Sequence, residues 1–322
     1  MSSYLPDSVT PDARIDADYF NYPHRRKGLD HDRFDRRFLR DMPVRNWTDG
    51  SRLKLWVTVH FEHFPMDMPA KPFVPPGGMD RPYPSVWDFS TRDYGNRVGI
   101  FRLFKVLDKY GIKATAAMNS VVAQRYPYLL QEILRRDWEV AAAGTDMGHL
   151  FHGQMDPAAE VALVQESFST LRSLSGQAVT GWHSPAFSQS AQTPDLVAAE
   201  GGKWIADWIN DDMPYAFRTS AGDLTQMPLS WDLSDHKILH NQNMAIPDYE
   251  WQINGAFAAL DAESKTEGAR ILSLSLSPWI IAQPSRIRAL DRMLGQFLGN
   301  EGVSHATGEA LRSDWVAMGG NA

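Results

Sequence analysis

The chain has 322 residues, 43% hydrophobic and 22% charged, so its composition is that of a globular protein with a sizeable core. Its 32 basic and 39 acidic residues give a formal net charge of −7, which argues against a nucleic-acid partner, because such partners require a basic face. The sequence contains no cysteine, which excludes disulfides, thiol catalysis and cysteine metal sites. The first residues lack an apolar signal core, and no run reaches the roughly 20 apolar residues of a membrane span. We therefore expect a cytoplasmic protein without a membrane partner.

Residues 1–50 are predicted to form an extended arm, because residues 22–38 are densely charged and lack a clean helical or strand period. We expect this arm to pack on its own domain or on a neighbouring subunit, and a phosphate-binding patch is the alternative. Residues 51–322 show no composition break and are predicted to form a single domain. The arm suggests a homo-oligomer, either a dimer or a tetramer.

Strand and helix signals alternate from residue 53 onward. The alternating apolar run at 53–61 predicts the first strand, and the seven prolines of 65–90 predict a long loop after it. Helices are predicted near 100–107, 127–136, 158–174, 194–200 (with Thr193 as N-cap), 249–265 and 286–298. Further strands are predicted at 113–119, 138–144, 179–183, 204–208, 224–227, 270–277 and 303–307. This alternation favours parallel strands with right-handed crossovers and a distorted (β/α) barrel of seven to eight strands.

Polar and aromatic residues collect where these strands end. Each one alone is more often a packed residue than a catalytic one, but barrel active sites lie at this face of the fold. The set comprises His60, Glu62, His63, Asn119, Thr145, Asp146, Trp182, His183, Asp207, Trp208, Ser277, Trp279 and His305.

Several stretches of the chain resemble the polysaccharide deacetylase superfamily, and more narrowly its branch of allantoinases and cyclic imide hydrolases. The most specific are Arg92-Asp-Tyr-Gly-Asn-Arg-Val-Gly-Ile100 and Ala206-Asp-Trp-Ile-Asn-Asp-Asp-Met-Pro-Tyr215. Shorter similarities lie at 61–64, 113–120, 278–287 and 305–309. The resemblance implies a polysaccharide deacetylase-like barrel and hydrolysis of a C–N bond, often in a ring.

The resemblance also marks departures from the pattern of metal-dependent relatives. Ala143 and Ser277 stand where relatives carry histidine, and Met147 stands where metal-dependent members carry a second ligand. Ser285 stands where relatives often carry histidine. One carboxylate and one histidine do not supply the three protein ligands of a catalytic zinc site. We therefore predict no metal and no other cofactor. A zinc ion would require a site rebuilt from Asp146, His149, His152 and His183, and we expect 146–152 to be a packed or surface loop instead.

These residues favour a metal-independent hydrolase that acts on a small cyclic amide, imide or ureide. Glu62 is the predicted general base, with His63 and His183 as further catalytic residues. Since strand side chains alternate, Glu62 is expected to share a face with His60 and to reach a second polar group such as Asn119, His183 or His305. The remaining strand-end residues, together with Arg97, are predicted to bind substrate.

Three alternatives stay open at this stage. Glu62 could be a structural carboxylate paired with an arginine such as Arg97. The chain could be a catalytically silent binding or regulatory subunit, because loss of catalysis would explain the replacement of histidine at positions 143 and 277. It could also be a lyase or an isomerase that uses Glu62 and a histidine of the same pocket as an acid–base pair.

Overall fold

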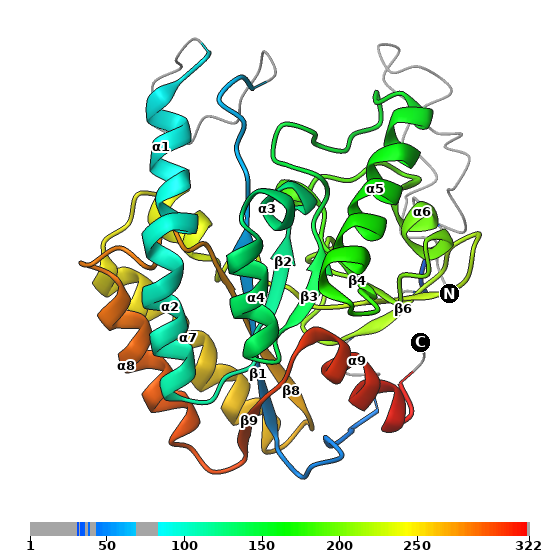
Figure 1. The fold of residues 1–322 in the computed structure, drawn as a ribbon. Coiled ribbons are helices and arrows are strands. Elements are labelled where there is room, and N and C mark those ends of the chain that lie inside the picture. Colours follow the sequence, from blue (N-terminus) through cyan, green and yellow to red (C-terminus); the bar gives the residue numbers. More distant parts are fainter. Residues whose placement is uncertain (1–30, 32, 36–37, 39–42, 69–82, 321–322) are drawn as a thin grey trace, which may run out of the picture.

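The computed structural model describes residues 31, 33–35, 38, 43–68 and 83–320. The predicted arm and the predicted loop at 65–90 therefore lie partly outside the described residues. Within the described part, the chain alternates strands and helices as the sequence predicts (Figure 1).

A single nine-stranded sheet organises these residues. Its order is β6-β7-β5-β4-β3-β2-β1-β8, and β9 pairs with β1 beside this path. All pairs are parallel, as predicted, except that of β7 with β6, an antiparallel edge strand that was not predicted. The strands are β1 Leu53–Phe61, β2 Thr115–Met118, β3 Glu139–Ala142, β4 Gly181–Trp182, β5 Trp204–Ile205, β6 Tyr215–Phe217, β7 Leu224–Gln226, β8 Arg270–Leu276 and β9 Val303–His305.

The sheet curls into a distorted half-barrel and does not close by backbone pairing. Within the described ranges no ladder joins β8 to the β6–β7 edge. A side chain bridges the gap instead, because the Ser230 backbone N–H donates to the Ser273 hydroxyl at 2.9 Å. The predicted distorted barrel is confirmed in this half-open form.

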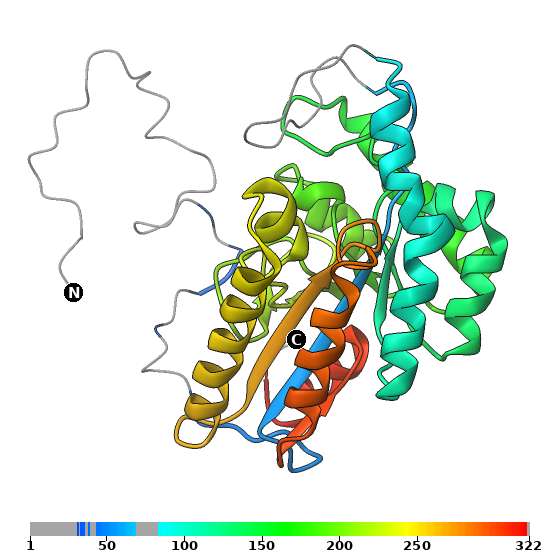
Figure 2. The same ribbon diagram turned by 90° about the vertical axis from the view of Figure 1, so that its left-hand side faces the viewer.

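Helices cover the outer face of the sheet, and α7 and α8 lie along β8 (Figure 2). They are α1 Val86–Tyr94, α2 Ile100–Lys109, α3 Ser120–Arg125, α4 Pro127–Arg135, α5 Pro157–Ser175, α6 Thr193–Ala199, α7 Ile246–Ser264, α8 Ile287–Leu298 and α9 Gly308–Ala317. Helix α1 begins inside the predicted long loop, and α9 was not predicted. Thr193 is the first residue of α6 rather than its N-cap, because its hydroxyl bonds to Glu160.

The central strand β1 is buried along its whole length and separates two apolar clusters. Leu55, Val57 and Val59 face the helices and join the larger cluster, as predicted for the first strand. The opposite face carries Trp56, which packs inside the half-barrel with side chains of β5 and α9. Helix α9 therefore fills the end of the half-barrel where the strands begin. The interior at the other end is left for the polar residues that follow β1.

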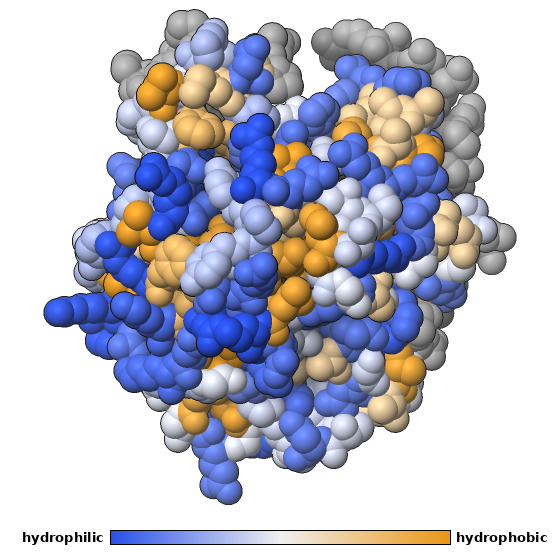
Figure 3. Space-filling view, in the orientation of Figure 1, coloured by the Kyte–Doolittle hydropathy of each residue, from blue (hydrophilic) through white to orange (hydrophobic). Residues whose placement is uncertain are grey.

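The edge where the parallel strands end is the hollowed side of the molecule. Figure 3 shows a depression there between the part that carries α1 and the part that carries α5. Among the described residues, no helix combines the length and the apolar character needed to cross a bilayer.

Candidate active site

His60 is the last interior side chain of β1 and is anchored to the neighbouring strand. Its Nε2 lies 2.7 Å from the Ser275 hydroxyl of β8. Its ring centroid is 5.2 Å from that of His183, which follows β4. Burial, together with the nearby His183 and His236, lowers the pKa of His60 well below its ordinary value, so this imidazole is neutral.

Glu62 lies one step further along the same face and is the central carboxyl of the site. Its Oε2 is buried and has no hydrogen-bond partner. Burial raises the pKa of Glu62, while the Trp279 indole N–H and the charges of Arg92 and His183 oppose that rise. The indole is near enough to act on the carboxyl, but its geometry falls short of a hydrogen bond, since Trp279 Nε1 also has no partner. Glu62 thus combines a raised pKa with an unfilled acceptor oxygen.

Arg92 of α1 supplies the positive charge beside Glu62. Its guanidinium lies 4.6 Å from the Phe64 ring centroid and 5.1 Å from that of Trp279. It forms an ion pair with Asp88 at 3.3 Å. The alternative pairing of Glu62 with Arg97 is wrong, because the Arg97 side chain is 74% exposed and lies 3.8 Å from Asp93.

Two glycines hold α1 and α2 against the loop that carries Trp279. A Cβ atom at Gly95 would lie 2.8 Å from the Trp279 backbone nitrogen, and one at Gly99 would lie 2.2 Å from the Pro278 carbonyl oxygen. Their φ angles, −56° and −58°, are helical. Glycine is therefore required by space and not by backbone conformation. This close approach fixes the helix of Arg92 relative to Trp279.

Asp235 is a second buried carboxyl of the site, and no sequence pattern predicts it. The Ser277 backbone N–H donates to both of its oxygens, at 3.0 and 2.8 Å. Burial and the charge of Glu62 raise the pKa of Asp235 well above its ordinary value, against the opposing backbone N–H groups. Ser277 therefore contributes its backbone N–H, which holds the end of β8 beside Asp235.

His183 and Asp207 form an oriented pair at the ends of β4 and β5. His183 Nδ1 lies 3.2 Å from Asp207 Oδ1 and 3.3 Å from the Ala206 carbonyl oxygen. The Ser184 backbone N–H and hydroxyl each donate to Asp207 at 2.6 Å. Such a partner on Nδ1 fixes the ring and leaves Nε2 available for proton transfer. Both residues were predicted as site residues, and the structure brings them together.

Trp182 supports this pair from the core. Its indole N–H donates to the Ser184 hydroxyl at 2.8 Å, and its ring packs against Phe151 and Phe168. It is fully buried, so its predicted role as a substrate contact was wrong.

A run of aromatic rings lines the site between His183 and Trp279. Neighbouring ring centroids are 4.5 to 5.9 Å apart. Burial, with nearby positive groups, lowers the pKa of His236 to about 3 and that of His240 to about 4, so both are uncharged at neutral pH. Both belong to the π-helical turn His236–Asn241, a geometry common at functional sites, and their i, i+4 spacing was the signal that the sequence offered. The rings are those of His183, Phe187, Trp231, His236, His240 and Trp279.

Asn119 and His63, two predicted site residues, make contacts that hold the backbone beside Glu62. Asn119 accepts a hydrogen bond from the His63 backbone N–H at 2.8 Å and donates to the Ala143 carbonyl oxygen. It therefore ties the ends of β1, β2 and β3 together. Burial, with the charge of Arg125, lowers the pKa of the His63 imidazole, which lies near Asp146 instead of in the aromatic run.

Three further predicted residues contact groups other than Glu62. Asp146 Oδ1 accepts the Gly148 N–H and lies 2.8 Å from His149 Nδ1, which makes 146–149 a local turn, and the Thr145 backbone carbonyl accepts the Val121 N–H. Trp208 packs on Phe217 at 5.2 Å between ring centroids.

His305 ends β9 as predicted, but the expectation that it lies within reach of Glu62 was wrong. His305 pairs with Leu55, seven residues before Glu62. At about 3.3 Å per strand residue, that separation is about 23 Å. His305 therefore cannot reach Glu62.

The available donors do not fit a metal centre. Among the residues the structure describes, no group of three histidine, aspartate or glutamate side chains could hold a metal ion. The acceptor oxygens of Asp235 receive backbone N–H groups, and the Nδ1 of His183 faces Asp207. A catalytic zinc site requires three converging protein ligands.

Fold and site together define an α/β half-barrel protein with buried carboxyl and imidazole groups at the C-terminal edge of its strands. This is the polysaccharide deacetylase-like fold. Residues 89–203 match the family model described as polysaccharide deacetylase.

Comparison with known proteins supports the same assignment of fold. A Schizosaccharomyces pombe protein described as a polysaccharide deacetylase is 22% identical over 291 residues, which cover 83% of this chain and 87% of that protein. The crystal structure of PuuE allantoinase superposes with a TM-score of 0.79 at 22% identity and covers 88% of this chain and 96% of its own. A Pseudomonas aeruginosa structure described as a polysaccharide deacetylase gives 0.78 at 22% identity, with 87% and 96% covered.

Proposed function

We propose that this chain hydrolyses a C–N bond in a small cyclic amide, imide or ureide, with Glu62 as the general base. The observation that carries the proposal is the state of Glu62, whose buried Oε2 lacks a partner and whose pKa is raised by burial. A carboxyl with a raised pKa is suited to accept a proton near neutral pH. The likeness of the fold to a structure named an allantoinase is consistent with a ring ureide as substrate.

In the first step, Glu62 takes a proton from water as the water oxygen bonds to the ring carbonyl carbon. The negative charge that forms on the carbonyl oxygen is stabilised by the Arg92 guanidinium and the Trp279 indole N–H, two donors that also act on the Glu62 carboxyl. In the second step, the C–N bond breaks and the ring nitrogen takes up a proton. A new carboxyl group and a free amine or amide end result.

His183 is the proposed carrier of that second proton. Asp207 holds its Nδ1, so the ring presents Nε2 in a fixed orientation. His183 is also near enough to affect the pKa of Glu62. Proton exchange between the two groups would return Glu62 to its basic form after each turnover.

The aromatic run fits an uncharged, planar ring. His236 and His240 are neutral because burial lowers the pKa of each, so this wall offers ring faces and few charges. Aromatic side chains make favourable contacts with flat, partly polar groups. An N-acetyl sugar, which is neither planar nor electronically activated, suits this wall less well than a strained or electron-poor ring.

The proposal is tested by a turnover screen of allantoin, hydantoins, dihydropyrimidines and cyclic imides on chelator-treated protein. We expect ring opening of at least one compound, and a rate about two to four orders of magnitude lower from the Glu62→Gln variant. Elemental analysis should find less than one transition metal ion per chain. Activity that is lost on chelation and restored by one zinc ion per chain would contradict the metal-independent mechanism. No turnover of any compound would favour a binding or regulatory protein.

A further inference from the structure

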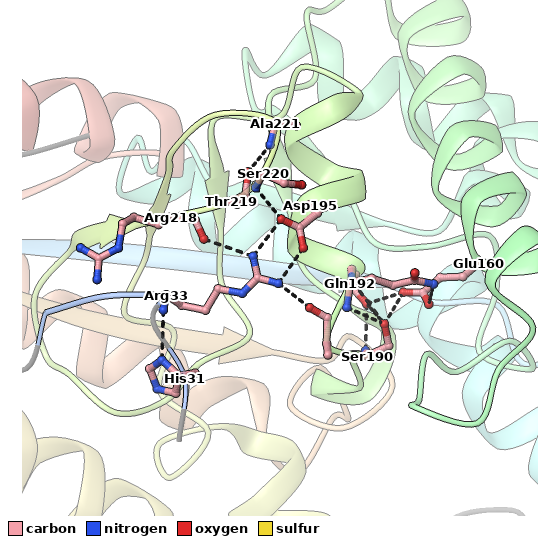
Figure 4. A network of polar contacts seen from close by, with 12 residues as sticks. His31, Arg33, Glu160, Ser190, Gln192, Asp195, Arg218, Thr219, Ser220 and Ala221 are labelled. Carbon is pink, nitrogen blue, oxygen red and sulfur yellow. Dashed lines mark hydrogen bonds and ion pairs between the residues drawn. The ribbon is translucent and has the colours of Figure 1, made fainter. Parts of the chain in front are cut away.

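Residues near the N-terminus are tied to the far side of the pocket by an arginine. Arg33 donates to both carboxylate oxygens of Asp195 in α6, at 2.8 and 2.6 Å, and to the Ala191 carbonyl oxygen at 2.6 Å (Figure 4). The Arg218 backbone N–H donates to the Arg33 carbonyl oxygen at 2.7 Å. Burial would raise the pKa of Asp195, but the bonds from Arg33 and Ser220 outweigh it, so its pKa is lowered. A two-pronged arginine–carboxylate pair of this kind fixes orientation as well as distance.

This anchor holds two rings against Trp208. The Phe34 ring centroid lies 5.6 Å from that of Trp208 and 4.9 Å from that of Tyr215 in β6. The His31 ring lies 5.0 Å from Trp208 on an edge-to-face geometry. We call His31, Arg33 and Phe34 the strap. Without the strap, the indole of Trp208 would lose the rings of His31 and Phe34 and keep that of Phe217.

The Gln189 side-chain amide connects Trp208, which packs on the strap, to the Asp207–His183 pair. In the orientation that satisfies both neighbours, the Gln189 side-chain oxygen accepts the Trp208 indole N–H at 2.6 Å. The Gln189 amide nitrogen then donates to Asp207 Oδ2 at 3.3 Å. Asp207 Oδ1 faces His183 Nδ1 at 3.2 Å. A continuous series of contacts therefore runs from the strap to the proposed proton carrier.

We propose that the strap positions the Asp207–His183 pair, and that Phe34 and Trp208 are positioning residues of the pocket. The effect should be moderate, because Ser184 supplies two further donors to Asp207 whether or not the strap is in place. The proposal rests on the proposed function only for its effect on turnover. Its effect on the orientation of the His183 ring can be measured without a substrate.

The experiment uses the full chain with Phe34→Ala and Trp208→Phe, separately and combined. Trp208→Phe keeps an aromatic ring and removes the indole N–H. It therefore tests the same series of contacts if Phe34→Ala does not fold. Phe101→Ala is the matched control, because Phe101 is a partly buried α2 ring that packs on Phe104 and Tyr128. The measurements are kcat, KM, and the ¹⁵N chemical shifts of the His183 ring, assigned with a His183→Gln variant.

We expect Phe34→Ala and Trp208→Phe each to lower kcat by about tenfold with little change in KM, as a small misplacement of a reacting group does. The His183 Nδ1 resonance should move in both variants, the double variant should be no worse than the more affected single one, and Phe101→Ala should match wild type. Unchanged His183 resonances in both Phe34→Ala and Trp208→Phe would overturn the proposal, even if the protein turns over substrate. Moved resonances in a protein without turnover would support the strap and count only against the proposed function.

Discussion

Two buried glutamates lie at opposite ends of the half-barrel, and both have a raised pKa. Glu139 begins β3 and accepts hydrogen bonds from the Glu309 backbone N–H at 3.1 and 3.2 Å, from Thr115 at 2.9 Å and from Trp204 at 3.2 Å. Burial raises its pKa to about 7, with a further contribution from Glu309 and despite these bonds. Glu62 follows β1 and has an acceptor oxygen without a partner.

The comparison shows that a raised pKa alone does not identify a reactive group. Glu139 is satisfied by the first residues of α9, so its carboxyl fastens the helix that fills one end of the half-barrel. Glu62 is left unsatisfied at the open end, where a substrate or water would complete its hydrogen bonds. Hydrogen-bond satisfaction, and not burial, separates the carboxyl of Glu139 from that of Glu62, the proposed general base.

The largest expected effect comes from replacing the Glu62 carboxylate with an amide, which cannot accept a proton. Glu62→Gln should lower kcat by about two to four orders of magnitude, the usual cost of removing a general base. Its melting temperature should stay near that of wild type, because Oε2 has no bond to lose. Steady-state kinetics measure the fall in kcat, and thermal unfolding measures the melting temperature. Near-normal turnover would remove Glu62 from the mechanism, and a large drop in melting temperature would make it a structural group.

Glu139→Gln should show the opposite pattern. The amide nitrogen would face backbone and indole N–H donors, so the free energy of unfolding should fall by about 1–3 kcal/mol. Turnover per folded molecule should stay close to wild type, since Glu139 lies at the end of the half-barrel away from Glu62. Denaturant titration gives the stability, and kinetics on the same preparation give the rate. A loss of turnover comparable to that of Glu62→Gln would contradict a purely structural role for Glu139.

The pH dependence of stability offers a further test at the satisfied end. The folded pKa of Glu139 is about 7 against an ordinary value of 4.5, so the folded state retains a proton that the unfolded state releases. The resulting stabilisation is fully present below about pH 4.5 and is lost as the pH rises through about 7. The difference in unfolding free energy between wild type and Glu139→Gln should therefore shrink from acidic to neutral pH. A difference that is constant over this range would show that Glu139 does not titrate in it.

The smallest expected effect concerns the donor beside Glu62. Trp279→Phe retains a ring in the aromatic run and removes the indole N–H, which already lacks a partner. A single neutral hydrogen bond contributes about 0.5–1.5 kcal/mol, so kcat should fall roughly threefold to tenfold. KM for the screened substrate should change little. An unchanged kcat would mean that the indole does not donate to the reacting oxygen.

The sequence was sufficient to predict β1 and the place of Glu62, because a buried strand alternates its side chains regardless of what surrounds it. The boundaries Leu53–Phe61 and the shared face of His60 and Glu62 follow from that local rule. Placement at predicted strand ends identified His183 and Asp207, which follow two neighbouring strands.

Local rules failed where partners distant in sequence decide the position. Asp235 lies between strands, and its place depends on the backbone N–H of Ser277, 42 residues later. His305 ends a strand, but β9 pairs with the beginning of β1, so its end lies far below the rim. Trp208 also ends a predicted strand, and the strap covers it. Strand register and tertiary contacts of this kind have no local pattern.

The contacts of Gly95 and Gly99 have a consequence for how this pocket can vary. A single methyl group at position 99 would have to displace a carbonyl oxygen 2.2 Å away, which would push α1 and its arginine off the loop that carries Trp279. The position of the Arg92 charge beside Glu62 therefore depends in part on the absence of side chains at Gly95 and Gly99. Redesign of the aromatic run could proceed ring by ring, whereas these two positions would tolerate no side chain at all without moving Arg92.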